Sequence, residues 1–106
     1  MLENKKQVNI IRGLRTLEWL KNQLLKSVAA VFVSLTEGCI ESAVNALADI
    51  MIGCYLLARR LNVSFIQLEL ALEEKVRYSR EQGHELERNH GDISDLLHYL
   101  RSRHKE

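Results

Sequence analysis

The stretch IESAVNALADIMIGCYLLARRL, residues 40–61, decides the fold of this chain. Between residues 46 and 58 nearly every position around the helical circumference is apolar, and Asp49 is the only charged residue. A helix that is hydrophobic on all sides must be covered on all sides. We therefore expect neighbouring helices, together with a second copy of the chain, to surround this central helix.

Asp49 is the residue of the central helix that needs an explanation. A carboxylate is costly to remove from water unless it is paired, hydrogen-bonded or bound to a cation. The sequence therefore predicts a polar pocket or a metal site beside Asp49. Glu41 and Asn45 precede Asp49 in steps of four residues, so that the three side chains share one face of the helix.

The composition favours a small all-α protein. The 106 residues include no proline and only five glycines, which leaves the turns of a β-rich fold without their usual residues. This length suits one domain over residues 1–106 with one modest core. A formal net charge of +1 gives no overall attraction to nucleic acid or to an anionic membrane.

No segment is expected to span a membrane. The most apolar run, residues 46–58, is short and contains Asp49, whereas a transmembrane helix needs about twenty apolar residues. The first residues, MLENKKQ, are not followed by the apolar core of a secretory signal, so a cytoplasmic location is expected. Cys39 and Cys54 fall on one helix about 22 Å apart, too far for a disulfide. We expect both to be buried free thiols.

A long amphipathic helix is predicted over residues 10–35, because apolar residues recur there in steps of three, four or seven. Residues 36–38 form a short link, in which Gly38 suits a left-handed cap, so the first two helices should form an antiparallel hairpin. If Glu18 and Asn22 face Asp49 and its neighbours, the hairpin contains a polar seam. Residues 1–8 and 104–106 are expected to fray. The predicted apolar seam of the first helix is Ile10, Leu14, Leu17, Leu24, Val28, Val31 and Leu35, with Leu20 close to the position missing from the pattern.

Two further helices are predicted after the hairpin. Asn62 suits a left-handed stop, and Ser64 with Gln67 matches a capping box, so a third helix should run from Ser64 to about residue 80 or 82. Asp92 can cap a last helix, with residues 84–91 as a loop or an extra helical turn. The result is a four-helix bundle that assembles into a homodimer or homotetramer through the central helix. The apolar stripes of these helices are Phe65, Leu68, Leu72 and Val76, and then Ile93, Leu96, Leu97 and Leu100.

Three stretches of the sequence are informative beyond their helical periodicity: RTLEWLKNQLL at 15–25, ALADIMIGCYLLARRLNVSF at 46–65 and HELERNHGDISDLLHYL at 84–100. They resemble the short bacterial MazG-like proteins of the all-α nucleoside-triphosphate pyrophosphohydrolase superfamily, and the resemblance runs from about residue 9 to 103. It implies an enzyme lineage that converts nucleoside triphosphates to monophosphates and pyrophosphate. It also implies Mg²⁺ held by two motifs, Glu-Glu-x-x-Glu on the first helix and Glu-x-x-Asp on the second.

Most of the implied carboxylates are missing from this chain. If Asp49 is the closing aspartate, Ala46 stands at the expected glutamate of the second helix. On the first helix, Lys21, Asn22 and Leu25 stand at the three glutamate positions. Magnesium takes hard oxygen ligands, usually one or two carboxylates with waters and phosphate oxygens. A single carboxylate would hold it weakly.

Two interpretations therefore stay open. In one, the protein is an active Mg²⁺-dependent pyrophosphohydrolase with a displaced metal site made by Glu18, Glu41 and Asp49. In the other, the fold persists with weak or no catalysis and without a cofactor, and Asp49 has a structural role. The residues expected to contact the nucleotide in the first interpretation are Asn22, Asn45, Lys21 and Lys75.

A helix-turn-helix DNA-binding module is a third alternative, because residues 55–75 have its rhythm of helix, turn and helix. The helix that would enter the DNA groove carries Glu69, Glu73 and Glu74 against Lys75. Acidic side chains repel phosphates, whereas recognition helices present basic and amide groups. Nucleic-acid binding is therefore not expected.

Overall fold

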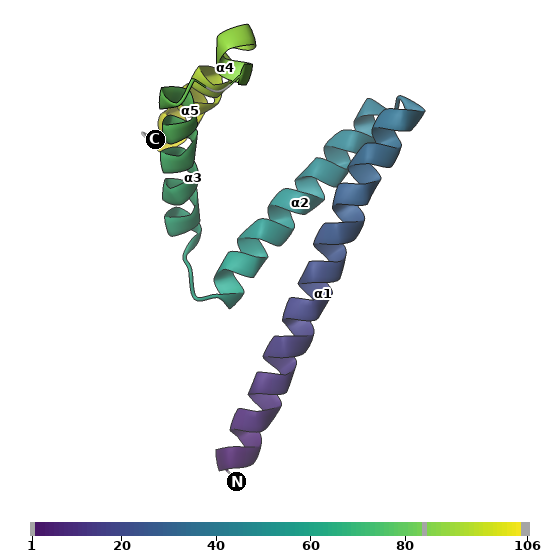
Figure 1. Cartoon of the computed structure of the whole chain (residues 1–106). Helices are drawn as coiled ribbons and strands as arrows, with labels where there is room; N and C mark the ends of the chain where they lie inside the picture. The colour runs from purple at the N-terminus through teal and green to yellow at the C-terminus, as the bar shows by residue number, and fades with distance from the viewer. Residues whose placement is uncertain (1, 84, 105–106) are drawn as a thin grey trace. The chain divides into compact units, whose positions relative to one another are not determined.

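A computed structural model describes residues 2–83 and 85–104, which are helical with short connections and contain no strand. The helices of this described part are α1 (Leu2–Glu37), α2 (Ile40–Arg60), α3 (Phe65–Glu81), α4 (Glu85–His90) and α5 (Asp92–His104) (Figure 1). The predicted all-α class is confirmed. The contacts divide the chain into two compact units, residues 1–63 and 64–106, and each is described by itself. A single domain over residues 1–106 stays a prediction.

The first unit is the predicted antiparallel hairpin of α1 and α2 (Figure 1). Gly38 has a φ of 72°, and the amide N–H of Cys39 donates to the Ser34 carbonyl at 2.9 Å, which closes the turn after α1. The left-handed cap at Gly38 is therefore confirmed. α1 begins at Leu2, earlier than the predicted start, because residues 2–9 contain no glycine or proline to end it. Residues 1, 105 and 106 lie outside the described residues.

Small residues form the contact between α1 and α2. The buried positions of α1 are Leu20, Ser27 and Ser34, at the seven-residue spacing of a coiled coil. Opposite them α2 buries mainly Ala43, Ala46, Gly53 and Ala58, and such small side chains let two helices approach closely.

The predicted apolar seam of α1 is correct in part, because Leu17, Leu24 and Val31 are half-buried in the hairpin. Four of its members, Ile10, Leu14, Val28 and Leu35, are exposed in the single chain. Ser27 and Ser34 complete the contact in place of those residues, since a smaller side chain at the contact allows a closer approach of the helices.

Within the first unit, α2 is covered on one side, by α1, whereas its apolar circumference predicts cover on all sides. Cys39 and Cys54 are free but exposed, so the prediction of buried thiols is wrong for the single chain. Large apolar side chains of both helices, exposed by 42 to 76%, recur at helical spacing beside the buried contact. We call this set the apolar face: Leu14, Val28, Phe32 and Leu35 of α1, and Ile40, Val44, Leu47 and Met51 of α2.

By length and composition alone, α2 is the one helix of the described part that could cross a membrane. This is weak evidence, because the central helix of a soluble protein has the same length and composition. Asp49 lies near the middle of α2, where a charge is costly in a bilayer. The carboxylate and the packing of α2 on an amphipathic α1 favour a soluble hairpin.

The second unit is built on α3 and α5. Val76, Leu97 and Leu100 form its buried core, with Ile93 packed against them, whereas Leu72 and Leu96 of the predicted stripes are exposed. These two leucines have no covering helix in this unit, because its core is formed by a single pair of long helices.

The predicted boundaries of the second unit are largely confirmed. Asn62 has a φ of 61°, and the Ser64 hydroxyl and the Gln67 side chain form the predicted capping box. α4 is the extra helical turn, so the described residues contain five helices instead of four. Asp92 is the first residue of α5 and not its cap, because the Gly91 carbonyl already accepts from the Asp95 amide.

Candidate functional site

A pocket of about 170 Å³ lies beside Asp49, between the two helices of the first unit. Trp19, Gln23 and Ser27 follow one another in steps of four residues, so they share one face of α1. Asp49 and Leu56 likewise share one face of α2. The lining residues are Trp19, Leu20, Gln23, Ser27, Asp49, Ile52, Gly53 and Leu56.

The two ends of this pocket differ in chemistry. Because α1 and α2 are antiparallel and joined at residues 38–39, Ser27 and Asp49 lie at the end nearer the link. Trp19 and Leu56 lie at the other end, about 12 Å away along the axis of α1 by the rise of a helix. Gln23 lies between them. The pocket therefore has a carboxylate and a hydroxyl at one end and apolar side chains at the other.

Asp49 gives the pocket its charge. It is the only ionisable residue in the lining, and it is exposed on the pocket side of α2. Among the described residues, no ion pair involves Asp49. Its carboxylate is therefore available to accept hydrogen bonds from a ligand.

Glu18 and Glu41, the other two predicted metal ligands, do not line this pocket. The Glu18 carboxylate pairs with the Lys21 ammonium of the same helix at 2.8 Å, and both side chains are more than half exposed. Glu41 is exposed in the first turn of α2. The predicted nucleotide contacts Asn22 and Asn45 are also exposed and are not among the lining residues.

The residues of one chain do not fit the magnesium that the resemblance implies. Within residues 2–83 and 85–104, no group of three or more histidine, cysteine, aspartate or glutamate side chains could hold a metal ion. The pocket offers the single carboxylate of Asp49. Magnesium demands near-octahedral coordination by hard oxygens and is reluctant to lose its waters. Glu18, Glu41 and Asp49 as metal ligands stay a prediction that needs a second chain.

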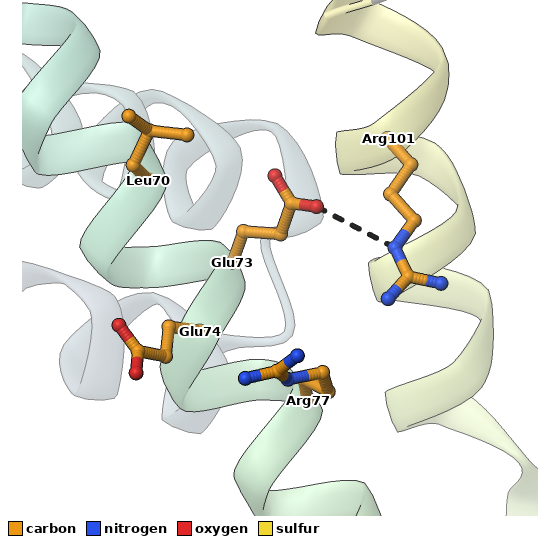
Figure 2. A pocket seen from close by; sticks show the side chains of 5 residues that line it. All are labelled: Leu70, Glu73, Glu74, Arg77 and Arg101. Atoms are coloured by element: carbon orange, nitrogen blue, oxygen red, sulfur yellow. Dashed lines mark ion pairs between the residues drawn. The ribbon is translucent and has the colours of Figure 1, made fainter.

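A larger pocket, of about 380 Å³, lies in the second unit between α3 and α5. Figure 2 shows Glu73 of α3 pointing toward Arg101 of α5, and the Arg101 Nε atom lies 3.4 Å from the Glu73 carboxylate. Glu74 and Arg77 complete its charged lining, with Leu70 as the apolar member (Figure 2). Two carboxylates balance two guanidinium groups, so the pocket has no net charge to attract a phosphate.

Ion pairs between α3 and α5 flank the apolar core of the second unit. A further pair joins Arg103 of α5 to Glu69 of α3 at 3.7 Å. Glu69 and Glu73 are thus both used in packing α5 against α3. Lys75, the remaining predicted nucleotide contact, lines a separate pocket of about 320 Å³ with Ala71, Glu74 and Tyr78. Lys75 belongs to the second unit and Asp49 to the first.

The sequence pattern identified Asp49 but not the α1 side of its pocket. Trp19 is 57% exposed and lines the pocket, although an aromatic residue at such spacing more often belongs to a core. The signal was present in the four-residue spacing of Trp19, Gln23 and Ser27. It was obscured because the neighbouring leucine-rich stripe predicted a different contact face.

Comparison with known proteins identifies one family. A model described as the MazG-like family matches residues 10–93, which run from the first third of α1 into the first turn of α5. No curated protein and no solved structure matches the chain.

Proposed function

We propose, because the chain belongs to the MazG-like family, that it is a relative of the nucleoside-triphosphate pyrophosphohydrolases in which catalysis is weak or absent. The observation that carries this proposal is the pocket beside Asp49, which contains one carboxylate. Metal-assisted attack on a triphosphate needs a cation that offsets phosphate charge and orients the attacking water. One carboxylate gives such a cation too few ligands.

The pairing of Glu18 supports the same proposal. Glu18 is the only acidic residue between positions 4 and 36, and its carboxylate lies 2.8 Å from the Lys21 ammonium. For Glu18 to join Asp49 in binding a metal ion, its carboxylate must first give up the ion pair with Lys21. The pair is exposed and worth at most about 1 kcal/mol, so the larger obstacle is the number of carboxylates and not the pairing.

We also propose a homodimer that forms through the apolar face. Its eight side chains are exposed by 42 to 76% in the single chain, and monomeric soluble proteins rarely expose contiguous apolar patches larger than a few hundred Å². A second hairpin presents the same face, and two hairpins together make a four-helix bundle. A homotetramer, made of two such dimers, is the alternative assembly. The proposed location of the protein is the cytoplasm.

An active enzyme with a displaced site is the alternative. It requires the second copy to bring acidic side chains to Asp49, because the described residues of one chain do not gather three. In that case Mg²⁺ must strengthen the binding of a nucleoside triphosphate, and Asp49 must be needed for the effect.

Equilibrium binding of a non-hydrolysable triphosphate, with and without Mg²⁺, tests the proposal. We expect no strengthening by Mg²⁺ in the wild-type protein or in Asp49→Asn. Glu37→Gln is the matched control, because Glu37 is an exposed carboxylate of the same hairpin that neither lines the pocket nor belongs to the predicted metal site. Strengthening that is present in the wild type and in Glu37→Gln but lost in Asp49→Asn would establish a metal site and overturn the proposal.

A further inference from the structure

We infer that the pocket beside Asp49 binds an elongated organic cation, with a protonated amine at the Asp49 end and an apolar or aromatic tail toward Trp19. This inference does not rest on the proposed function. It depends on the charge, the polarity and the length of the pocket.

The charge of the pocket selects a cation. Asp49 is its only ionisable lining residue and has no ion pair within residues 2–83 and 85–104. The hydroxyl of Ser27, which lies on the facing helix at the same end, adds an acceptor for the N–H groups of an ammonium. A phosphate or carboxylate ligand would meet Asp49 with a charge of the same sign.

The other end of the pocket selects an apolar tail. Leu20, Ile52 and Leu56 supply aliphatic walls, and the indole of Trp19 supplies a flat aromatic surface. Aromatic side chains provide large contact area and prefer stacked or edge-to-face packing against a second ring. The amide of Gln23 lies between the ends and can donate to or accept from a polar atom midway along the ligand.

The dimensions exclude a large ligand. A volume of about 170 Å³ is below the range of roughly 300–1,000 Å³ in which drug-sized ligands bind. An axial span of about 12 Å is long for that volume, so the pocket is narrow. A chain-like amine fits such a space, whereas a nucleoside triphosphate does not.

Tryptophan fluorescence tests this inference directly, because Trp19 is the only tryptophan of the chain. The probes are phenylbutylamine, the neutral phenylbutanol and the anionic phenylbutyrate, which share a tail and differ in the charge at one end. We expect a saturable change with the amine, with a dissociation constant of about 1 mM or below. We expect binding at least about tenfold weaker for the alcohol and none for the carboxylate. Equal binding of amine and alcohol, or no saturable response to the amine, would overturn the inference.

Asp49→Asn removes the charge and keeps the shape of the side chain. We expect it to abolish the preference for amine over alcohol while the alcohol still binds. Glu41→Gln, which removes a carboxylate of α2 outside the pocket, should keep the preference of the wild type. If Asp49→Asn keeps the full preference, the amine does not bind at Asp49 and the inference is wrong. Circular dichroism checks that each variant retains its helices.

Discussion

A Cβ atom added at Gly53 of α2 would lie 2.6 Å from the Cδ2 atom of Leu24 on α1. No ordinary van der Waals contact is so short, so the Leu24 side chain leaves no room for a larger residue at position 53. The same residue lines the pocket beside Asp49. The close approach and the pocket are therefore features of one helix contact.

Gly53→Ala should stabilise the protein less than Gly13→Ala. Alanine is worth up to about 1 kcal/mol more than glycine in a helix interior. Gly13 has nothing within 4 Å of an added Cβ, so it should show the full gain. At Gly53 the Leu24 side chain must rotate away, which offsets that gain. Gly53→Leu should destabilise by about 1–3 kcal/mol through overpacking. Urea unfolding measures the stability of all three variants. Equal gains in stability from alanine at Gly13 and at Gly53 would contradict the close approach of Leu24 to Gly53.

Phe32→Glu should dissociate the proposed dimer. Phe32 belongs to the apolar face, and burying a side chain of this kind stabilises an interface by about 1.5–3 kcal/mol. Val33→Glu is the control, because Val33 is also exposed on α1 but lies one residue, about 100°, around the helix. Light scattering after gel filtration gives the mass of each. A dimer that survives Phe32→Glu and dissociates in Val33→Glu would contradict the proposal, because the interface would then lie on the Val33 side of α1 and not on the apolar face.

Cys39 should react with iodoacetamide at lower pH than an ordinary thiol. Its Sγ atom lies 3.1 Å from the Ser42 hydroxyl, and this hydrogen bond, followed by one from the Ser42 backbone, lowers the pKa of Cys39. Because the thiolate is the nucleophile, a lower pKa moves the rise of the alkylation rate to lower pH. In a Cys54→Ser background, Ser42→Ala should shift that rise to higher pH. The same midpoint with and without the Ser42 hydroxyl would disprove the effect.

Ser64→Ala should lower the free energy of unfolding of the second unit by about 1 kcal/mol. The Ser64 hydroxyl accepts from the Gln67 amide at 3.1 Å, and the Gln67 side chain accepts from the Ser64 amide at 2.8 Å. Ser79→Ala, inside α3, removes a hydroxyl without removing a cap and should change the stability by less than about 0.5 kcal/mol. Thermal unfolding followed at the helical circular dichroism band measures both. Equal losses would mean that the cap is not what stabilises α3.

The elements of the fold could be predicted because local residues specify them. Gly38, Asn62 and the Ser64 capping box ended or began helices where their backbone preferences require it. The packing register of α1 was predicted only in part, at Leu17, Leu24 and Val31. Its contact uses Ser27 and Ser34, and small polar residues carry no hydrophobic signal even where they are buried.

The candidate site was predictable in part for the same reason. Asp49 could be identified from the sequence because it is a charge within an apolar helix. Its pocket partners come from the other helix, and which side of α1 faces α2 depends on a register that hydrophobicity predicted only in part. Leu14, Val28 and Leu35 of the predicted seam are exposed and contribute to the apolar face. Residues that serve a second chain cannot be distinguished by pattern from residues that serve a core.

Pyrophosphate release from a panel of ribo- and deoxyribonucleoside triphosphates, with Mg²⁺ or Mn²⁺, tests the central claim most directly. We expect no metal-dependent release above the rate without protein, or at most a slow release that is the same in the wild type and in Asp49→Asn. Glu37→Gln serves as the control for loss of a carboxylate that lies outside the pocket and outside the predicted metal site. Metal-dependent release by the wild type that disappears in Asp49→Asn and persists in Glu37→Gln would contradict the claim, and would show that Asp49 serves a working metal site.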